Sequence, residues 1–147
     1  MIYFLVSILA FFLFLALFCL SVASILKKRG NAEEFEYLLR KAYTRRYGFI
    51  LGVSVYIESK ELLLLREDAI KAKDLKKIRE INDRISLTLD SLKLSKEDRK
   101  ECISLKKDID CYIDAYNDSV DIFNRSVFGI RNRFAARICQ VKRLERI

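Results

Sequence analysis

Among the side chains that most often act as metal ligands or general bases, this chain has four cysteines and twenty carboxylates but no histidine. The commonest general base and the commonest metal ligand are therefore missing. The cysteines form no C-x-x-C pair, so neither a zinc site nor a thioredoxin-like redox motif is predicted. The few glycines form no phosphate-binding loop. We therefore expect no enzyme, no cofactor and no metal site.

The positions of the cysteines add a second expectation. Cys102, Cys111 and Cys139 lie outside the apolar N-terminal stretch, and an odd number of thiols fits a reducing, cytosolic setting. Cys102 and Cys139 fall on the apolar face of a predicted helix. We expect both to be buried, where a cysteine packs as a small hydrophobic side chain.

The N-terminal stretch is the first element to be placed. Residues 2–26 contain no charged side chain, and a helix needs about 20 apolar residues to cross a bilayer. We predict a transmembrane anchor over residues 1–26 and a helical domain over residues 27–147, which holds every charge. A cleaved signal peptide is the alternative, favoured by the small residues at 21–24. It lacks a basic start, and its apolar region exceeds the usual length of about 7–15 residues.

The charges beside this stretch predict its orientation. Lys27, Lys28 and Arg29 follow its C-terminal end, and nothing basic precedes it. Positive flanks remain on the cytoplasmic side of a membrane. We therefore predict a single-pass protein of the inner cell membrane with a cytoplasmic C-terminal domain.

The remaining residues have the apolar spacing of long helices. One helix is expected from about residue 32, after Gly30, to residue 73; a second follows Asp74, and a third begins after a cap at Ser95. Apolar residues of the third recur at a mean spacing of 3.5, and this helix could break near Gly129. The predicted fold is all-α, an antiparallel bundle of three to four long helices behind the anchor. An intermolecular coiled coil is the alternative, which the broad apolar face of the first helix disfavours.

The apolar segment 47–57 allows two interpretations. It contains a G-x-x-x-G spacing, which is associated with close helix packing in lipid. At about 11 residues it is too short to span a bilayer. We expect it to lie in the bundle core, with contact at the membrane surface as the alternative.

Two motifs resemble those of the LemA family of bacterial membrane-anchored helical proteins. The family segment R-R-[YF]-D-L-I-P-N-L-V is similar to residues 45–53, although Gly48, Leu51 and Gly52 replace its Asp, Pro and Asn. The family pattern Y-N-x-x-V-x-x-[YF]-N matches residues 116–124 at every specified position. The motif positions are Arg45, Arg46, Tyr47, Tyr116, Asn117, Val120, Phe123 and Asn124. The resemblance implies a divergent member with an antiparallel four-helix domain on a single-pass anchor, and it implies no reaction.

The second motif has its own physical interpretation. Tyr116 and Phe123 are one heptad apart, so they share a helix face, and Asn117 and Asn124 lie together beside it. We expect the aromatic rings to fill the core and each asparagine to hydrogen-bond a neighbouring helix and fix the register. A binding role for the two asparagines is the alternative.

Positive charge gathers at the two ends of the predicted domain. The last 23 residues carry seven basic side chains against the single carboxylate of Glu145. Each basic residue close to an anionic leaflet contributes about 1 kcal/mol of binding. We hypothesise that the C-terminal segment lies on the inner membrane surface; an ordinary solvated basic face is the alternative. The residues expected at anionic lipid are Lys27, Lys28, Arg29, Arg131, Arg133, Arg137, Lys142, Arg143 and Arg146.

These patterns favour a non-enzymatic interaction or scaffold module on the cytoplasmic face of the membrane. The expected partners are the membrane and an unidentified protein, with no small-molecule substrate. A membrane-associated signalling bundle, or one that tethers nucleic acid through its basic C-terminal segment, is the alternative. Against nucleic acid, the aromatic residues of that segment are few and fall on the apolar face, where they are poorly placed to stack on bases.

Overall fold

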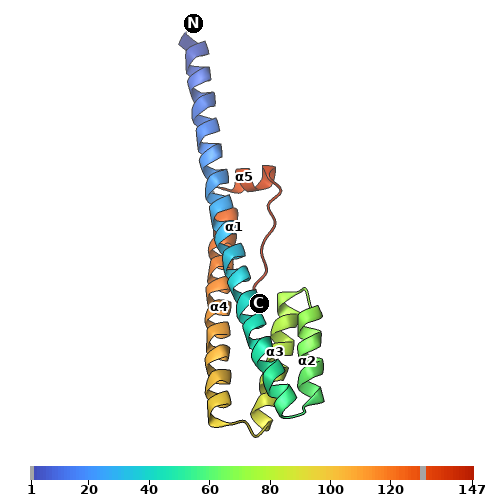
Figure 1. Cartoon of the computed structure of the whole chain (residues 1–147). Helices are drawn as coiled ribbons and strands as arrows, with labels where there is room; N and C mark the ends of the chain where they lie inside the picture. The colour runs from blue at the N-terminus through green and yellow to red at the C-terminus, as the bar shows by residue number, and fades with distance from the viewer. Residues whose placement is uncertain (1, 130–131) are drawn as a thin grey trace. The chain divides into compact units, whose positions relative to one another are not determined.

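The structure, a computed structural model, describes residues 2–129 and 132–147, and every regular element within them is an α-helix (Figure 1). The predicted all-α class is confirmed for this part of the chain. The helices are α1 (Ile2–Tyr56), α2 (Lys60–Lys71), α3 (Leu75–Ser91), α4 (Lys96–Phe128) and α5 (Arg133–Ile138).

The described chain divides into two compact units. We call residues up to 35 together with residues 116–146 the anchor unit, and residues 36–115 the hairpin unit. Helices α1 and α4 each contribute residues to both. The predicted end of the transmembrane anchor at residue 26 is a boundary between lipid and water, which the division into packing units does not test. It therefore stays a prediction.

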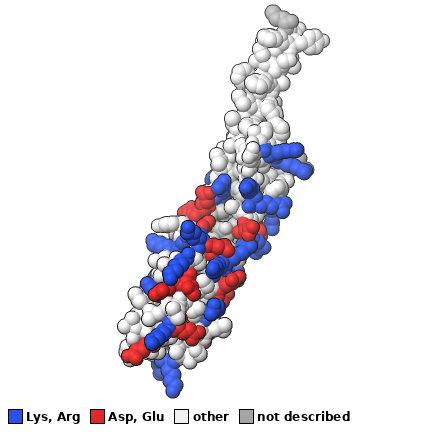
Figure 2. Space-filling view, turned by 90° about the vertical axis from the view of Figure 1, so that its right-hand side faces the viewer, with Lys and Arg blue, Asp and Glu red and all other residues white. Residues whose placement is uncertain are grey.

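The N-terminal part of α1 is apolar and exposed. Its most apolar 18-residue window is only 6% buried, so this helix is long and apolar enough to cross a membrane. Figure 2 shows no charge on the corresponding end of the molecule, whereas basic and acidic side chains are interspersed elsewhere on that face. From residue 21 onward, side chains such as Ser21 and Ile25 are buried.

The rest of the anchor unit packs on this helix. Ile25 of α1 forms a buried cluster with Phe123 and Val127 of α4 and with Ala135 and Ala136 of α5. The two long helices run antiparallel in this unit, as Figure 1 shows. Lys28 Nζ donates a hydrogen bond of 2.9 Å to Ser126 Oγ across them.

The break expected near Gly129 is present, because α4 ends at Phe128 and α5 begins at Arg133. Beyond the break the apolar spacing of α4 no longer identifies the buried side chains, since α5 is only six residues long, runs in a new direction (Figure 1) and buries Ala135 and Ala136 instead. Phe134 and Ile138 are exposed on it. Cys139, expected to be buried, is also exposed, whereas Cys102 is buried as expected.

In the hairpin unit, α2 and α3 pack against each other, joined by a short connection. Buried side chains from all four helical segments form its interior, among them Leu39, Ile50, Leu65, Ile85 and Ile109. These contacts support the predicted antiparallel bundle in part. The segment 47–57 buries one face, including Ile50 and Val53, while Val55 and Tyr56 are exposed. Its predicted place in the core is therefore correct for that face only.

The first predicted helix is wrong at both ends. It does not begin after Gly30, because α1 continues through that residue. A glycine inside a helix costs only about 1 kcal/mol, and an Arg29–Glu33 ion pair of 2.8 Å bridges the position.

The same helix also ends earlier than predicted, at Tyr56. Glu58 has a φ of 54°, Glu58 N donates to Val55 O and Ser59 N donates to Ser54 O. This is a Schellman motif with glutamate where glycine is usual. Ser59 then caps α2 by accepting from Leu62 N.

The cap at Ser59 was not predicted, whereas the two predicted caps, Asp74 and Ser95, are correct. Asp74 Oδ1 accepts a hydrogen bond of 3.2 Å from Lys76 N at the start of α3. At the start of α4, Ser95 Oγ accepts from Asp98 N at 3.0 Å and donates to Asp98 Oδ2 at 2.7 Å. These side chains occupy backbone N–H groups that a helix start leaves unpaired.

Candidate functional site

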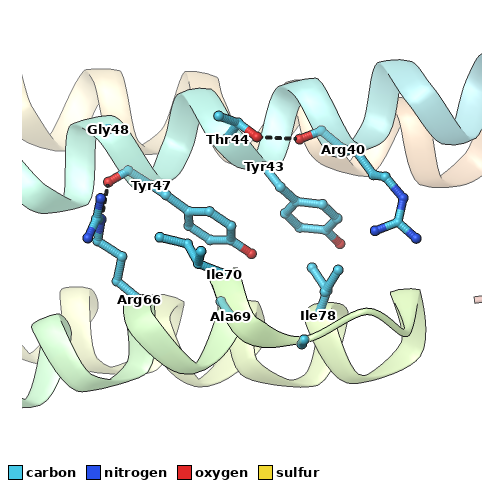
Figure 3. A pocket seen from close by; sticks show the side chains of 10 residues that line it. Arg40, Tyr43, Thr44, Tyr47, Gly48, Arg66, Ala69, Ile70 and Ile78 are labelled. Carbon is cyan, nitrogen blue, oxygen red and sulfur yellow. Dashed lines mark hydrogen bonds between the residues drawn. The ribbon is translucent and has the colours of Figure 1, made fainter.

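The hairpin unit contains a groove of about 500 Å³ between α1 and the α2–α3 hairpin (Figure 3). Half of its lining residues are small or aliphatic, and the other half are tyrosine, threonine and arginine. The lining residues are Arg40, Tyr43, Thr44, Tyr47, Gly48, Arg66, Ala69, Ile70, Ala72 and Ile78. This volume lies within the range of ligand pockets, about 300–1,000 Å³.

Tyr43 and Tyr47 form the α1 side of the groove. They lie one helical turn apart, so their rings stack, with centroids 6.2 Å apart and planes at 13°. The rings are 2% and 6% exposed. Neither hydroxyl has a hydrogen-bond partner within the described residues.

Burial keeps both phenols protonated. It raises the pKa of Tyr43 well above its ordinary value, and the neighbouring Tyr47 adds to this. Burial likewise raises the pKa of Tyr47 to about 12, against the opposing charge of Arg46. Both hydroxyls are therefore hydrogen-bond donors over the physiological pH range.

Two arginines lie at opposite ends of the pair of rings, as Figure 3 shows. Arg66 Nε donates to the backbone oxygen of Tyr47 at 3.0 Å, which ties α2 to α1. Arg40 Nε donates to Glu36 Oε1 at 2.9 Å, and its Nη2 donates to Lys73 O at 3.0 Å. No Asp or Glu is among the residues that line the groove, but Arg40 forms an ion pair with Glu36, with 2.9 Å between its Nη2 and Glu36 Oε1.

Arg46 lies in the interior next to this site and is 0% exposed. Its Nη2 donates to Ser86 Oγ at 2.8 Å, whereas its Nε and Nη1 have no hydrogen-bond partner in the described chain. Burial lowers the pKa of Arg46, because removing a cation from water is costly.

Cys102 of α4 lies close enough to Arg46 to interact with it. Burial raises the pKa of the Cys102 thiol, and the positive charge of Arg46 opposes that shift. The protonated thiol is therefore the stable form, which is typical of a structural cysteine and not of a nucleophile.

The first LemA-like motif thus divides over three environments. Tyr47 lines the groove and Arg46 is buried behind it, whereas Arg45 is exposed beside a smaller cavity of about 170 Å³ that Asp108 and Tyr112 also line. Sequence reasoning missed Tyr43, Arg40 and Arg66 as members of a site. The signal available was the spacing of Tyr43 and Tyr47, four residues apart.

The second motif lies in the anchor unit and holds the C-terminal segment. Tyr116, Val120 and Phe123 are buried, as expected. Asn124 does not bond a neighbouring helix; it makes two hydrogen bonds with the backbone of Leu144. Tyr116 Oη donates to Glu145 O at 3.2 Å. The two asparagines are buried or half-buried within this packing.

The basic residues expected at lipid have several different neighbours. Lys28 bonds Ser126, the Arg143 guanidinium lies 4.0 Å from the centroid of the Phe128 ring, and Arg146 Nη1 lies 3.3 Å from Asp121 Oδ2. Lys27, Arg29, Arg133, Arg137 and Lys142 are exposed, and Arg131 lies outside the described residues.

No protein-family model, curated protein sequence or solved structure matches the chain. Within the described residues no cluster of His, Cys, Asp or Glu could hold a metal ion. The groove has an apolar floor, with Arg66 and the ion-paired Arg40 at its two ends.

Proposed function

We propose that this protein is a single-pass membrane protein whose helical domain acts as a non-enzymatic interaction scaffold on the cytoplasmic face. One observation carries the proposal. The apolar side chains of residues 2–20 are exposed almost without exception, although the remainder of α1 has a buried face. Nineteen helical residues span about 28 Å, close to the hydrocarbon thickness of about 30 Å.

The position of α5 supports a membrane boundary between residue 20, where the exposed stretch ends, and residue 26, where the predicted anchor ends. The Phe134 ring packs edge-on against Phe14 and Phe18 of the proposed span, with centroid distances of 5.8 and 6.4 Å. Arg133 and Arg137 are exposed on the same short helix. Interfacial helices commonly bury Phe and other apolar side chains at the boundary between headgroups and acyl chains, while their arginines reach to the headgroups. We place Arg133 and Arg137 at the anionic leaflet on this basis.

The cytoplasmic side follows from Lys27, Lys28 and Arg29, and membership of the LemA family remains part of the proposal. The nucleic-acid alternative gains no support. The Arg143 guanidinium lies over the Phe128 ring in a cation–π contact, and the Phe134 ring packs against α1. Neither ring is therefore arranged to stack on bases.

Cysteine labelling of the full chain in cells tests the side and the anchoring together. A variant that keeps Cys111 alone, with Cys19 and Cys102 changed to Ala and Cys139 to Ser, presents one exposed thiol on α4. We expect a membrane-impermeant maleimide to label it only after permeabilisation, in a protein that sediments with the membranes.

The matched control adds Tyr3→Cys to a chain in which all four native cysteines are replaced. Its thiol is expected at the outer surface and should be labelled in intact cells. Labelling of Cys111 in intact cells would contradict the orientation. Recovery of a soluble chain lacking its first two dozen residues would contradict the anchor.

The scaffold role is tested by photo-crosslinking in the native membrane. A photoreactive residue at Tyr56 or Leu87, which are 85% and 72% exposed, should give discrete adducts with another protein. The same residue at Leu9 should react with lipid. Absence of protein adducts from every exposed position tested on α1–α4 would contradict an interaction role.

A further inference from the structure

A further groove lies in the anchor unit, where α5 meets the proposed membrane span. It has a volume of about 200 Å³ and is lined by Phe14, Leu17, Phe18, Ser21, Phe134 and Ala135. Its four α1 residues share one face of the helix, because their positions follow the helical period of 3.6 residues. Phe14, Leu17 and Phe134 are 50–56% exposed and form its accessible walls. Ser21 and Ala135 are nearly buried and lie deeper, so the groove is open to an apolar molecule from outside the protein.

The dimensions of this groove suit part of a lipid acyl chain. Its volume of about 200 Å³ is below the range of about 300–1,000 Å³ that is typical of pockets enclosing a whole small molecule. From residue 14 to residue 21 it extends about 10 Å along α1, at about 1.5 Å per residue. In the proposed membrane this stretch lies directly below the headgroups. A flexible acyl chain can therefore occupy the groove with its upper part and leave the rest among neighbouring lipids.

The groove is polar at one end, as a lipid is. Ser21 lies at the end nearer to the charged residues that follow the span. Its Oγ donates a hydrogen bond of 2.9 Å to Leu17 O, so the donor of this hydroxyl is satisfied within α1. Phe14 forms the other end, seven residues deeper in the proposed span. This polarity orients an occupant with its headgroup near Ser21 and its chain toward Phe14.

Two arginines of α5 supply the charge that an anionic headgroup needs. Arg133 and Arg137 are exposed, and neither has an ion-pair partner among the described residues. They lie four residues apart, so they share a face of α5 that adjoins the side chain of Phe134. Residues 126–144 contain no Asp or Glu. Because arginine binds phosphate through paired N–H donors, these two side chains favour a phosphate group beside the groove.

The direction of α5 agrees with this position. Figure 1 shows α5 running across α1, so α5 lies along the membrane surface when α1 spans the bilayer. Besides the two arginines, its exposed side chains are the apolar Phe134 and Ile138. An interfacial helix buries such apolar side chains among the acyl chains and directs its basic side chains to the headgroups.

We propose that this groove binds one anionic phospholipid of the cytoplasmic leaflet, whose acyl chain lies between α1 and α5 and whose phosphate is bound by Arg133 and Arg137. The proposal rests on the proposed membrane anchor, because the groove must lie within a bilayer. It goes further in predicting a lipid held at one defined site, rather than a general attraction of basic residues to the leaflet.

Photo-crosslinking of the full chain in defined bilayers tests this site. The bilayers consist of phosphatidylcholine with a small fraction of probe, which is either phosphatidylglycerol or phosphatidylcholine with the same diazirine in its acyl chain, close to the glycerol. Tandem mass spectrometry locates the adducts. We expect phosphatidylglycerol adducts concentrated at residues 14–21 and 134–135. The preference over phosphatidylcholine should be about tenfold or more, because each basic residue near an anionic headgroup favours binding roughly fivefold.

Two kinds of variant separate a defined site from general contact with lipid. Leu17→Trp should remove the adducts on α5 by filling the groove. Leu15→Trp is the matched control, because Leu15 is 44% exposed on the same helix and does not line the groove. Arg133→Gln combined with Arg137→Gln should retain the adducts and lower the preference at least fivefold. Lys142→Gln, at an exposed basic position of the same unit, should leave the preference unchanged, and thermal unfolding should show that each variant folds.

Three results would overturn the proposal. The first is an even spread of adducts over residues 2–20 with both probes, which would leave the membrane anchor intact. The second is an unchanged adduct pattern in folded Leu17→Trp. The third is a disulfide-linked dimer of Leu17→Cys, in a chain without its native cysteines, together with no lipid adduct in the groove; a second copy would then be the occupant. Absence of lipid adducts from all of residues 2–20 would contradict the anchor as well, so the two failures are distinguishable.

Discussion

The side-chain amide of Asn124 pairs with the backbone of Leu144 through two hydrogen bonds. Asn124 Nδ2 donates to Leu144 O at 2.9 Å, and Leu144 N donates to Asn124 Oδ1 at 3.1 Å. Leu144 belongs to a segment without regular secondary structure, so its backbone groups need partners from elsewhere. The asparagine supplies both, which fixes the chain after α5 against α4.

Asn124→Ala should release this segment. Each hydrogen bond contributes about 1 kcal/mol net, so local protection should fall by about 2 kcal/mol and the Leu144 amide should exchange roughly 30-fold faster. Hydrogen exchange of the full chain measures this directly. The control is Asn31→Ala, an exposed asparagine in the same unit, which should leave Leu144 unchanged. Equal exchange in Asn124→Ala and the parent would show that the pairing does not hold the segment.

Glu58→Gly should stabilise the hairpin unit. Glu58 adopts a φ of 54°, a conformation that costs a residue with a Cβ about 1–2 kcal/mol and that glycine adopts freely. The larger conformational entropy that glycine loses on folding offsets part of this cost. We therefore expect the free energy of unfolding, measured by chemical unfolding, to increase by about 0.5–1 kcal/mol. The matched change Glu80→Gly, at an exposed position inside α3, should instead cost about 1 kcal/mol. A loss of stability in Glu58→Gly would contradict the Schellman geometry.

Arg46→Met should leave the protein at least as stable as the parent, and we expect a gain of about 1 kcal/mol or more. The substitution removes a fully buried cation, two of whose nitrogens have no hydrogen-bond partner among the described residues, and keeps an apolar stem of similar length. Ser86 Oγ retains a partner, since it donates to Asn82 O at 3.0 Å. Arg46→Ala, by contrast, should be less stable than the Met variant because it leaves a cavity. Destabilisation of Arg46→Met by more than about 2 kcal/mol would indicate that the guanidinium has a compensating partner.

Alkaline pH should destabilise the hairpin unit through its two buried tyrosines. Their folded pKa values are raised, so the folded state holds the phenol protons more tightly than the unfolded state, whose tyrosines ionise at the ordinary value of 10.0. The free energy of unfolding that each protonated tyrosine contributes is present in full below pH 10 and is lost as the pH rises. For Tyr47 this loss continues up to about pH 12. Each tyrosine should contribute up to about 1.4 kcal/mol per pH unit in that window.

Unfolding free energies of Tyr47→Phe and the parent at pH 9 and pH 11 test this expectation. The variant should lose less stability over the interval, by roughly 1 kcal/mol. Tyr56→Phe serves as the control, because that ring is 85% exposed and the substitution should leave the slope unchanged. A slope identical in Tyr47→Phe and the parent would contradict the burial of Tyr47.

Much of the fold could be predicted because it depends on local patterns. The apolar spacing predicted α3 and α4. The capping residues Asp74 and Ser95 predicted where these helices begin, because a cap bonds a backbone group only two or three residues away. The end of α1 was not predictable in the same way. A glycine at the left-handed position usually marks the end of a helix, but here Glu58 occupies that position. Gly30, which predicted a helix boundary, lies inside a continuous helix.

The groove was beyond sequence reasoning for a different reason. Tyr43 and Tyr47 have the spacing of ordinary core residues, and they are indeed buried. The groove beside them exists because Gly48 and the small residues Ala69 and Ala72 leave it open. Whether such a groove forms depends on which helices pack against each other. The apolar pattern of α1 does not specify which helix packs on it. The motif resemblance pointed to Tyr47 but not to the residues opposite.

The embedding of the N-terminal helix in lipid is the claim on which the functional account rests most heavily. Because the chain contains no tryptophan, a single introduced tryptophan reports depth through quenching by lipids brominated on their acyl chains. Leu9→Trp and Phe134→Trp are placed in and against the proposed span, whereas Ile122→Trp is an exposed position on α4 in the same unit. We predict strong quenching at position 9, quenching by shallow bromines at 134 and none at 122. Water-exposed, unquenched emission from position 9 in full-length protein reconstituted into bilayers would contradict the account.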